Sequence, residues 1–385
     1  MNCPRPPLLA AALAGIALLA AGCGGAAHPT VSPKTASHAP PLSLATSVAT
    51  TSRTWAVLVL GDSPDRADNF WQLLARPAAG GTWRLVTPPG VASNGGLAVA
   101  PTGPSSLLAG FLPSQDLLFT PLAATANSGA TWSAGVLNAK LAGTPDALAA
   151  GQGTSKVLAL LADNSLRQST NGGRTWTTIA TEHGLASTQV GRRCGLTRLT
   201  GTAFTPAGDP MLTGDCASNG QPGIFTFTAG TWQRTGPDVP TGQPVTALAI
   251  TSTAGVTRVL LATGTGSATT LTVASYTSDP AHWSLSHQVT AGSAKVLSVS
   301  ASGNGVMAVL LAGRRGLLLA GAAAGWRRLP ELPPATQALA AGQGPQLQAL
   351  TAARTTVGIW ALNDSGSAWT QVQHLSVPIQ VGSSS

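Results

Sequence analysis

The sequence predicts an all-β protein, a seven-bladed β-propeller of four-stranded antiparallel blades. Tryptophan recurs along the chain at intervals of 49, 44, 56, 51, 43 and 43 residues, at Trp83, Trp132, Trp176, Trp232, Trp283, Trp326 and Trp369. Periods in the forties that contain only strand-like segments are typical of propeller blades rather than helical repeats. Composition agrees, because 45 Gly, 28 Pro and only 9% charged residues suit short apolar strands separated by turns.

Each interval holds four short apolar segments. In the third repeat we expect strands at 147–151, 156–161, 165–170 and 174–180. The same division places strands at 199–205, 210–214, 223–228 and 231–235, and again at 296–302, 306–312, 316–321 and 325–329. The first blade then begins near Leu44 and the last ends near Val377. Six or eight blades stay open as alternatives, because the terminal repeats are weak.

Two repeats carry a local motif just before the tryptophan. It reads Thr125-x-Asn127-x-Gly129-x-Thr131-Trp132 in one and Ser169-x-Asn171-x-Gly173-x-Thr175-Trp176 in the other. Both segments resemble the Asp-box, or bacterial neuraminidase repeat, with Asn where that pattern has Asp. The other five copies are eroded; the last reads Asp364-x-Gly366-x-x-Trp369.

The motif also has a physical interpretation of its own. A short polar side chain folds back onto turn amides, a glycine supplies a positive φ, and the tryptophan packs between neighbouring sheets. We therefore expect these turns to be structural and to join the third and fourth strands of a blade. The loops after the second and fourth strands then lie together at the opposite end, here called the loop end, where propellers usually bind their ligands.

The N-terminus predicts export. In residues 1–22, Arg5 precedes an apolar run from Leu8 to Ala21, as in a signal peptide. The segment Leu19-Ala20-Ala21-Gly22-Cys23 resembles the bacterial lipobox, which implies that Cys23 is lipidated and becomes the mature N-terminus. An ordinary signal peptide that ends near a cysteine is the alternative. Residues 23–42 then form a tether rich in Pro, Ser, Thr and Ala, and residues 43–385 form the propeller, which we expect to be monomeric and held by lipid to the outside of the bacterial cell membrane.

Two cysteines remain for a structural role. Cys3 lies in the signal and Cys23 would carry lipid, which leaves Cys194 and Cys216 in an oxidising compartment. We predict a disulfide between them. Two buried free thiols are the alternative.

The net charge of +8 is thinly scattered, which argues against a nucleic-acid partner. An arginine cluster at the loop end would suit a carboxylate, sulfate or phosphate group, and solvated loop residues are the plainer interpretation. The candidate binding residues at the loop end are Arg66, Asp163, Arg192, Arg193, Asp215, Arg314, Arg315 and Arg354.

The sequence gives no catalytic set. The resemblance to sialidases implies an arginine triad and a tyrosine paired with glutamate, yet Tyr276 is the only tyrosine and falls on a predicted third strand, away from the loop end. The histidines show no metal-binding spacing, and we expect neither a metal nor a cofactor. We predict a non-catalytic propeller that binds a protein or an envelope polymer, similar to Asp-box propellers that serve as assembly factors. The alternative is a glycoside hydrolase that uses carboxylates such as Asp62, Asp163 or Asp215.

Overall fold

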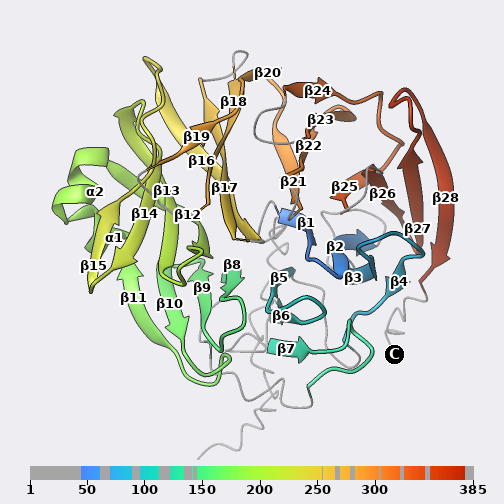
Figure 1. Cartoon of the computed structure of the whole chain (residues 1–385), viewed down its shortest axis with the longest axis horizontal. Coiled ribbons are helices and arrows are strands. Elements are labelled where there is room, and N and C mark those ends of the chain that lie inside the picture. Colours follow the sequence, from blue (N-terminus) through green and yellow to red (C-terminus); the bar gives the residue numbers. More distant parts are fainter. Residues whose placement is uncertain are drawn as a thin grey trace, which may run out of the picture. The chain divides into compact units, whose positions relative to one another are not determined.

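The computed structural model describes residues 45–60, 70–88, 96–111, 122–133, 141, 145–253, 255–264, 269–277, 282–302, 305–320, 325–342 and 347–377. All of them belong to a unit that runs from Ser37 to Ser385. The predicted signal peptide, Cys23 and the tether lie outside the described residues, as does Arg66. Strands dominate the described part, and two short helices are added to them (Figure 1).

The strands of the described residues form seven groups, each made of consecutive strands that pair antiparallel. Group 1 contains β1 (Ala45–Ala49), β2 (Arg53–Leu60), β3 (Phe70–Pro77) and β4 (Arg84–Leu85). Group 2 contains β5 (Leu97–Pro101), β6 (Leu107–Phe111) and β7 (Leu122–Thr125). Group 3 contains β8 (Pro145–Ala150), β9 (Val157–Leu161), β10 (Ser165–Ser169) and β11 (Thr177–Thr181). In group 2 the described residues hold three of the four predicted strands.

The remaining groups follow the same plan. Group 4 contains β12 (Leu196–Phe204), β13 (Pro210–Asn219), β14 (Gly223–Thr228) and β15 (Thr231–Arg234), and group 5 contains β16 (Pro244–Thr253), β17 (Val256–Thr263), β18 (Thr269–Tyr276), β19 (Ser284–Leu285) and β20 (Val289–Gly292). Group 6 contains β21 (Val296–Ala301), β22 (Met307–Leu311), β23 (Arg315–Leu319) and β24 (Trp326–Arg328). Group 7 contains β25 (Thr336–Ala341), β26 (Leu347–Ala353), β27 (Thr356–Leu362) and β28 (Trp369–Ser376). The strands predicted in the third, fourth and sixth repeats are confirmed to within a few residues.

Two contacts join groups into larger sheets. The innermost strand β1 pairs in parallel with β21, so that groups 1 and 6 share an eight-stranded sheet, and β13 pairs with β16 between groups 4 and 5. The buried Ser47 and Ser300 hydroxyls bond each other across the β1–β21 pair at 3.0 Å. Inner strands of different groups therefore meet directly through their backbones at this point.

The core consists of seven apolar clusters, each between two groups. Groups that follow one another along the chain share six of them, and group 7 shares the seventh with group 1. Each cluster contains, or packs against, a different one of the seven recurring tryptophans. Inner strands such as β9 (VLALL) are buried on both faces because a neighbouring sheet covers each side, whereas outer strands such as β28 are mostly exposed.

The helices α1 (Glu182–Ala186) and α2 (Gln189–Cys194) lie between β11 and β12. Thr181 and Thr188 cap their N-termini by accepting hydrogen bonds from Gly184 N and Gly191 N, and Gly195 ends α2 with φ 67°. The strand pattern of the sequence did not predict these helices. None of the helices in the described part is long and apolar enough to cross a membrane.

Candidate functional site

The two predicted box turns form the expected hydrogen bonds. Asn171 Oδ1 accepts from Thr175 N at 2.9 Å, and its Nδ2 donates to Thr175 Oγ1. Ser169 Oγ accepts from Gly173 N at 2.8 Å, where Gly173 has φ 90°. The turn before Trp132 has the same hydrogen bonds: Asn127 bonds the N–H and hydroxyl of Thr131, and Thr125 Oγ1 accepts from Gly129 N. These residues hold their turns together, as the physical argument from the sequence expected.

A third turn of this kind lies in group 7, one residue from where the sequence placed it. Asn363, not Asp364, accepts from Ser367 N at 2.9 Å and from Ala368 N at 3.2 Å. Its Nδ2 donates to Ser367 Oγ, as Asn171 does to Thr175. The turn carries one extra residue before Trp369, which is why a fixed motif spacing selected the wrong polar residue.

Five of the recurring tryptophans connect neighbouring groups by hydrogen bonds, while the indole of Trp176 donates to the Gly173 carbonyl of its own turn. Five indole N–H groups donate to a backbone carbonyl three or four residues after the preceding tryptophan, on or just beyond the outer strand of the previous group: Trp132 to Val86, Trp232 to Ile179, Trp283 to Thr235, Trp326 to His287 and Trp369 to Pro330. Each indole buries apolar area and satisfies its polar atom in the same contact. These five tryptophans therefore have a structural role.

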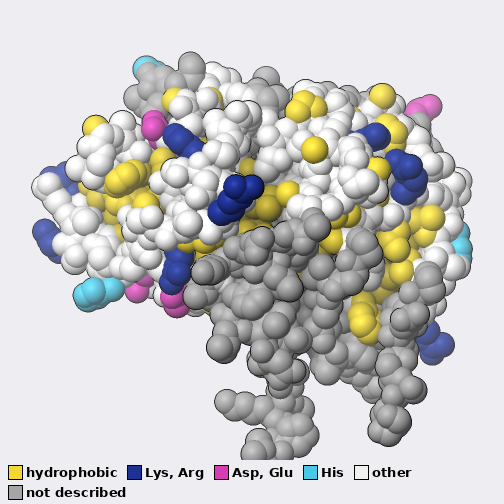
Figure 2. All heavy atoms as spheres, turned by 90° about the horizontal axis from the view of Figure 1, so that it is seen from below, with side chains coloured by type: hydrophobic (Ala, Val, Ile, Leu, Met, Phe, Trp, Pro, Cys, Tyr) yellow, Lys and Arg dark blue, Asp and Glu magenta, His cyan; other side chains and the backbone are white. Residues whose placement is uncertain are grey.

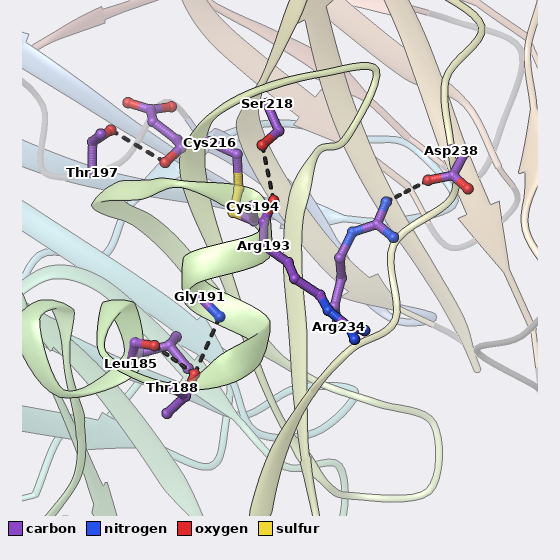
Figure 3. Close-up of a disulfide and its surroundings, with 11 residues drawn as sticks. Leu185, Thr188, Gly191, Arg193, Cys194, Thr197, Cys216, Ser218, Arg234 and Asp238 are labelled. Carbon is purple, nitrogen blue, oxygen red and sulfur yellow. Dashed lines mark hydrogen bonds and ion pairs between the residues drawn. A yellow bond between two sulfur atoms is a disulfide. The ribbon is translucent and has the colours of Figure 1, made fainter.

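The loop end contains the β9–β10, β13–β14, β22–β23 and β26–β27 turns and the β11–β12 connection, since antiparallel strands alternate in direction. A disulfide between Cys194 and Cys216 fastens α2 to β13 there, with a Cα–Cα distance of 5.2 Å (Figure 3). The predicted pairing is confirmed. Cys216 lies within β13, which extends to Asn219, and not after the strand as the sequence suggested. Ser218 Oγ also donates to the Arg193 carbonyl at 2.9 Å.

The helix α2 presents Arg192 and Arg193, both exposed, at this end. The Arg192 guanidinium donates to the Ser187 carbonyl at the start of the short link between the helices. Helix α2 crosses α1 closely: a Cβ at position 191 would stand 2.1 Å from the Leu185 carbonyl, so only glycine fits. Capping, disulfide and close packing together fix the backbone that carries the two arginines.

Four charged side chains gather where groups 3 and 4 meet. Arg198 on β12 pairs with Asp215 on β13 at 2.9 Å, and Asp163 accepts from Ser165 N and Oγ in the β9–β10 turn. The Asp146 side chain is exposed to solvent, yet its partial burial raises its pKa; Arg198 lowers it and Asp163 raises it, so these groups lie within electrostatic reach of one another. Asp146 and Arg198 were not among the predicted residues. Arg198 and Asp215 carry opposite charges at facing positions of the β12–β13 hairpin, and that pairing is the sequence signal that could have identified Arg198.

Asp146 owes its position to a bulge that several groups share. The pairing of the first two strands skips a residue at Asp146, Leu248, Leu297 and Gln337, in groups 3, 5, 6 and 7. A bulge redirects the side chain of the extra residue. The bulged residue differs in chemistry from group to group, so the same backbone device can serve packing, bonding or solvent exposure.

The other predicted arginines do not form one cluster in the described structure. Arg314 pairs with Glu331 at 2.8 Å and donates to the Leu332 carbonyl, while Arg315 donates to Ala312 in its own turn. Arg314 and Arg354 both have positive φ, 58° and 51°, in the corresponding turns of groups 6 and 7. On the face shown in Figure 2, Lys and Arg side chains also lie scattered among neutral and apolar ones. The loop end carries several local ion pairs and turns.

Tyr276 lies at the end of β18, 3% exposed, with its hydroxyl 3.1 Å from Met211 Sδ. Burial raises the pKa of the Tyr276 hydroxyl above its usual value, which disfavours the phenolate that a nucleophile would need. Among the described residues no three His, Cys, Asp or Glu side chains are grouped so that they could hold a metal ion.

Comparison with known proteins shows the fold. No family model and no curated protein matches the chain. Among solved structures the chain is similar to a protein from Lactobacillus plantarum, with a TM-score of 0.54 and 11% identity over 85% of this chain and 97% of the other. It is also similar to the GH74 xyloglucanase of Xanthomonas campestris, with a TM-score of 0.51 and 12% identity over 85% of this chain and 52% of the other. A six-bladed β-propeller lectin from Aleuria aurantia matches with a TM-score of 0.40 and 13% identity over 88% of this chain and 96% of the other. At these identities the likeness concerns fold alone. The chain is a β-propeller.

Proposed function

We propose that the chain is a cell-envelope lipoprotein whose β-propeller binds a protein or an envelope polymer through its loop end. In this proposal each strand group is one blade, and the ring of seven closes where group 7 packs against group 1. The apolar cluster between those groups, which includes Leu58, Trp83, Leu350 and Ile359, supports closure at that point. The hydrogen bonds of Asn127 and Asn171 support membership of the Asp-box propellers.

One observation carries the binding role. The α1–α2 segment is capped at both helix N-termini, fastened by a disulfide and packed on the strands, yet its Arg192 and Arg193 side chains remain exposed. Charged side chains held on a rigid scaffold bind with little loss of conformational entropy. Arginine is also enriched at interface positions that dominate binding energy.

The test is capture from detergent-solubilised cell envelope with three versions of the propeller. One is unchanged, one carries Arg192→Ala and Arg193→Ala, and the matched control carries Lys156→Ala and Arg174→Ala, two exposed charges at the turn end. We expect a partner that survives the control substitutions and is lost with the α2 substitutions. Equal capture by all three would contradict binding through the α2 arginines.

Lipidation is tested separately. Growth with a labelled fatty acid should mark the full chain, and Cys23→Ser should remove the label and release the protein from the membrane fraction. Label that persists in the Cys23→Ser chain would exclude this cysteine as the anchor.

A second candidate function rests on Asp146. A carboxyl group whose pKa is raised, close to a second carboxylate, is what an acid-catalysed glycoside hydrolysis requires. Release of reducing ends from purified envelope glycans, abolished by Asp146→Asn and unaffected by Asp238→Asn at an exposed surface pair, would favour this function over binding alone.

A further inference from the structure

Arg76 is a buried cation at the contact between groups 1 and 7. It lies on β3, 4% exposed, with its guanidinium 5.3 Å from the centre of the Trp83 ring. Its Nε has no hydrogen-bond partner in the described part of the structure, and none of the ion pairs found there includes it. A buried arginine normally has a carboxylate or several carbonyls as partners, because an uncompensated charge is costly to remove from water.

Two other arginines near the turn end show the contrast. Arg258 is 7% exposed, and its Nη1 lies 3.5 Å from the Ser302 carbonyl, while Arg53 Nε donates to Ser128 Oγ at 2.5 Å. Burial lowers the pKa of Arg76 to about 10, and it lowers the pKa of Arg258 as well. Among the described residues, what distinguishes Arg76 from the other two arginines is that its guanidinium has no hydrogen-bond partner.

The end of the Arg76 side chain reaches group 7. A Cβ at position 342 would stand 2.7 Å from Arg76 Nη2, so the absence of a side chain at Gly342 is what leaves room for the guanidinium. The same point is 3.5 Å from the Ala78 carbonyl of group 1. The guanidinium therefore lies between the two groups, with the Trp83 ring on one side and the backbone of Gly342 on another.

We propose that Arg76, Trp83 and Gly342 form a binding site for an oxyanion, a carboxylate, sulfate or phosphate group, at the contact between groups 1 and 7. The planar guanidinium presents paired N–H donors that match two oxygens of such a group. The bound anion supplies the missing counter-charge, and the Trp83 ring, 5.3 Å from the guanidinium, adds a cation–π contact. Because the site involves residues from both groups, its occupation also stabilises their contact.

The experiment is a titration of the full chain, purified in detergent, with sodium phosphate, sulfate and acetate at constant ionic strength kept with sodium chloride. The midpoint of thermal unfolding, Tm, is followed, since a ligand that binds only the folded state raises Tm in a saturable way. Arg76→Gln removes the charge and keeps much of the volume. Arg258→Gln is the matched control, because Arg258 is also buried and belongs to none of the ion pairs of the described residues.

We expect a saturable rise in Tm for the unchanged chain and for Arg258→Gln, and its loss in Arg76→Gln. The anion that saturates at the lowest concentration identifies the class of group. A rise without saturation that is equal in all chains is general salt exclusion and contradicts the site. No rise in the unchanged chain with any of the three anions contradicts it too.

A second variant guards against failure of Arg76→Gln to fold. Gly342→Ala keeps the arginine and places a methyl group against its guanidinium. It should weaken anion binding at least tenfold, measured by calorimetry, while Gly325→Ala, where a Cβ meets nothing within 4 Å, leaves it unchanged. Unaltered affinity in Gly342→Ala would place the anion elsewhere.

Discussion

Groups that follow one another along the chain are joined differently from the two groups at its ends. At five of the sequential contacts, an indole N–H donates to a backbone carbonyl three or four residues after the previous tryptophan, as Trp232 does to Ile179. At the contact of group 7 with group 1, Trp83 Nε1 donates instead to the side chain of Gln348 at 2.6 Å. Trp83 is also more deeply buried than the other repeat tryptophans, at 1% exposed.

Two more glutamines complete this end-to-end contact. Gln337 accepts from Val59 N at 2.7 Å and donates to Val59 O at 2.8 Å, and Gln373 does the same for the N and O of Trp83, at 2.8 Å each. A side-chain amide has one donor and one acceptor in the same arrangement as a peptide group, so each glutamine replaces a strand neighbour. The indoles of the sequential contacts thus donate to backbone acceptors, whereas the contact of group 7 with group 1 is made through glutamine side chains, and we expect it to be more sensitive to substitution.

The largest effect that distinguishes the two kinds of contact is expected for tryptophan truncation. Trp83→Ala should cost about 3–5 kcal/mol in the free energy of unfolding, because it opens a cavity and leaves Gln348 unpaired. Trp232→Ala should cost less, since that ring is only half-buried. Urea unfolding of both variants measures the difference, and equal losses would remove the distinction.

The next largest loss of stability is expected at the contact between groups 3 and 4, where a disulfide adds to the indole hydrogen bond of Trp232. Replacing Cys194 and Cys216 together by Ala should cost roughly 3 kcal/mol, because the bond restricts a 22-residue loop in the unfolded chain. The measurement is urea unfolding with and without a reductant. A reductant should destabilise the unchanged chain by a similar amount and leave the double variant unaffected.

Glutamine substitutions test the end-to-end contact directly. Gln373→Ala should cost about 2 kcal/mol, since it leaves the N–H and C=O of Trp83 without partners. Gln371→Ala, two residues earlier on the exposed face of β28, is the control and should change stability little. If both variants unfold at the same urea concentration as the unchanged chain, the glutamine bonds contribute nothing.

The smallest effect is a pH dependence at the loop end, far from either kind of contact. Burial raises the pKa of Asp146, so the folded chain holds this proton more tightly than the unfolded chain. Stability from this group is therefore gained as pH falls through the raised pKa, and at pH 7 its charge opposes folding. Asp146→Asn should be slightly more stable than the unchanged chain at pH 7, and the advantage should shrink at pH 4 in urea unfolding.

Much of the strand arrangement could be predicted from sequence, because each strand is short, apolar and bounded by turn residues. The segment 296–302 was recognised in this way and is β21 in the structure. The pairing of β1 with β21 could not be predicted, since it joins segments about 250 residues apart and leaves no local pattern. The helices α1 and α2 were missed because each is too short to show helical periodicity, although Thr181, Thr188 and Gly195 are recognisable caps.

The site residues divide in the same way. The disulfide was predicted from the expected export and the number of cysteines, and the roles of Asn127 and Asn171 were predicted from turn chemistry. The partner of Arg314, Glu331, lies 17 residues further along the chain, and Arg76 meets Gly342 only because groups 1 and 7 pack together. Contacts of that kind depend on how the strand groups pack and not on any local segment.

The most direct test of the end-to-end contact is amide hydrogen exchange at Val59 and Trp83, the two backbone N–H groups that donate to glutamine side chains. Both amides should exchange slowly in the unchanged chain. Gln337→Ala should accelerate exchange at Val59 alone, and Gln373→Ala at Trp83 alone. Fast exchange at both amides in the unchanged chain, or rates unaffected by either substitution, would show that glutamine side chains do not join the two ends of the propeller.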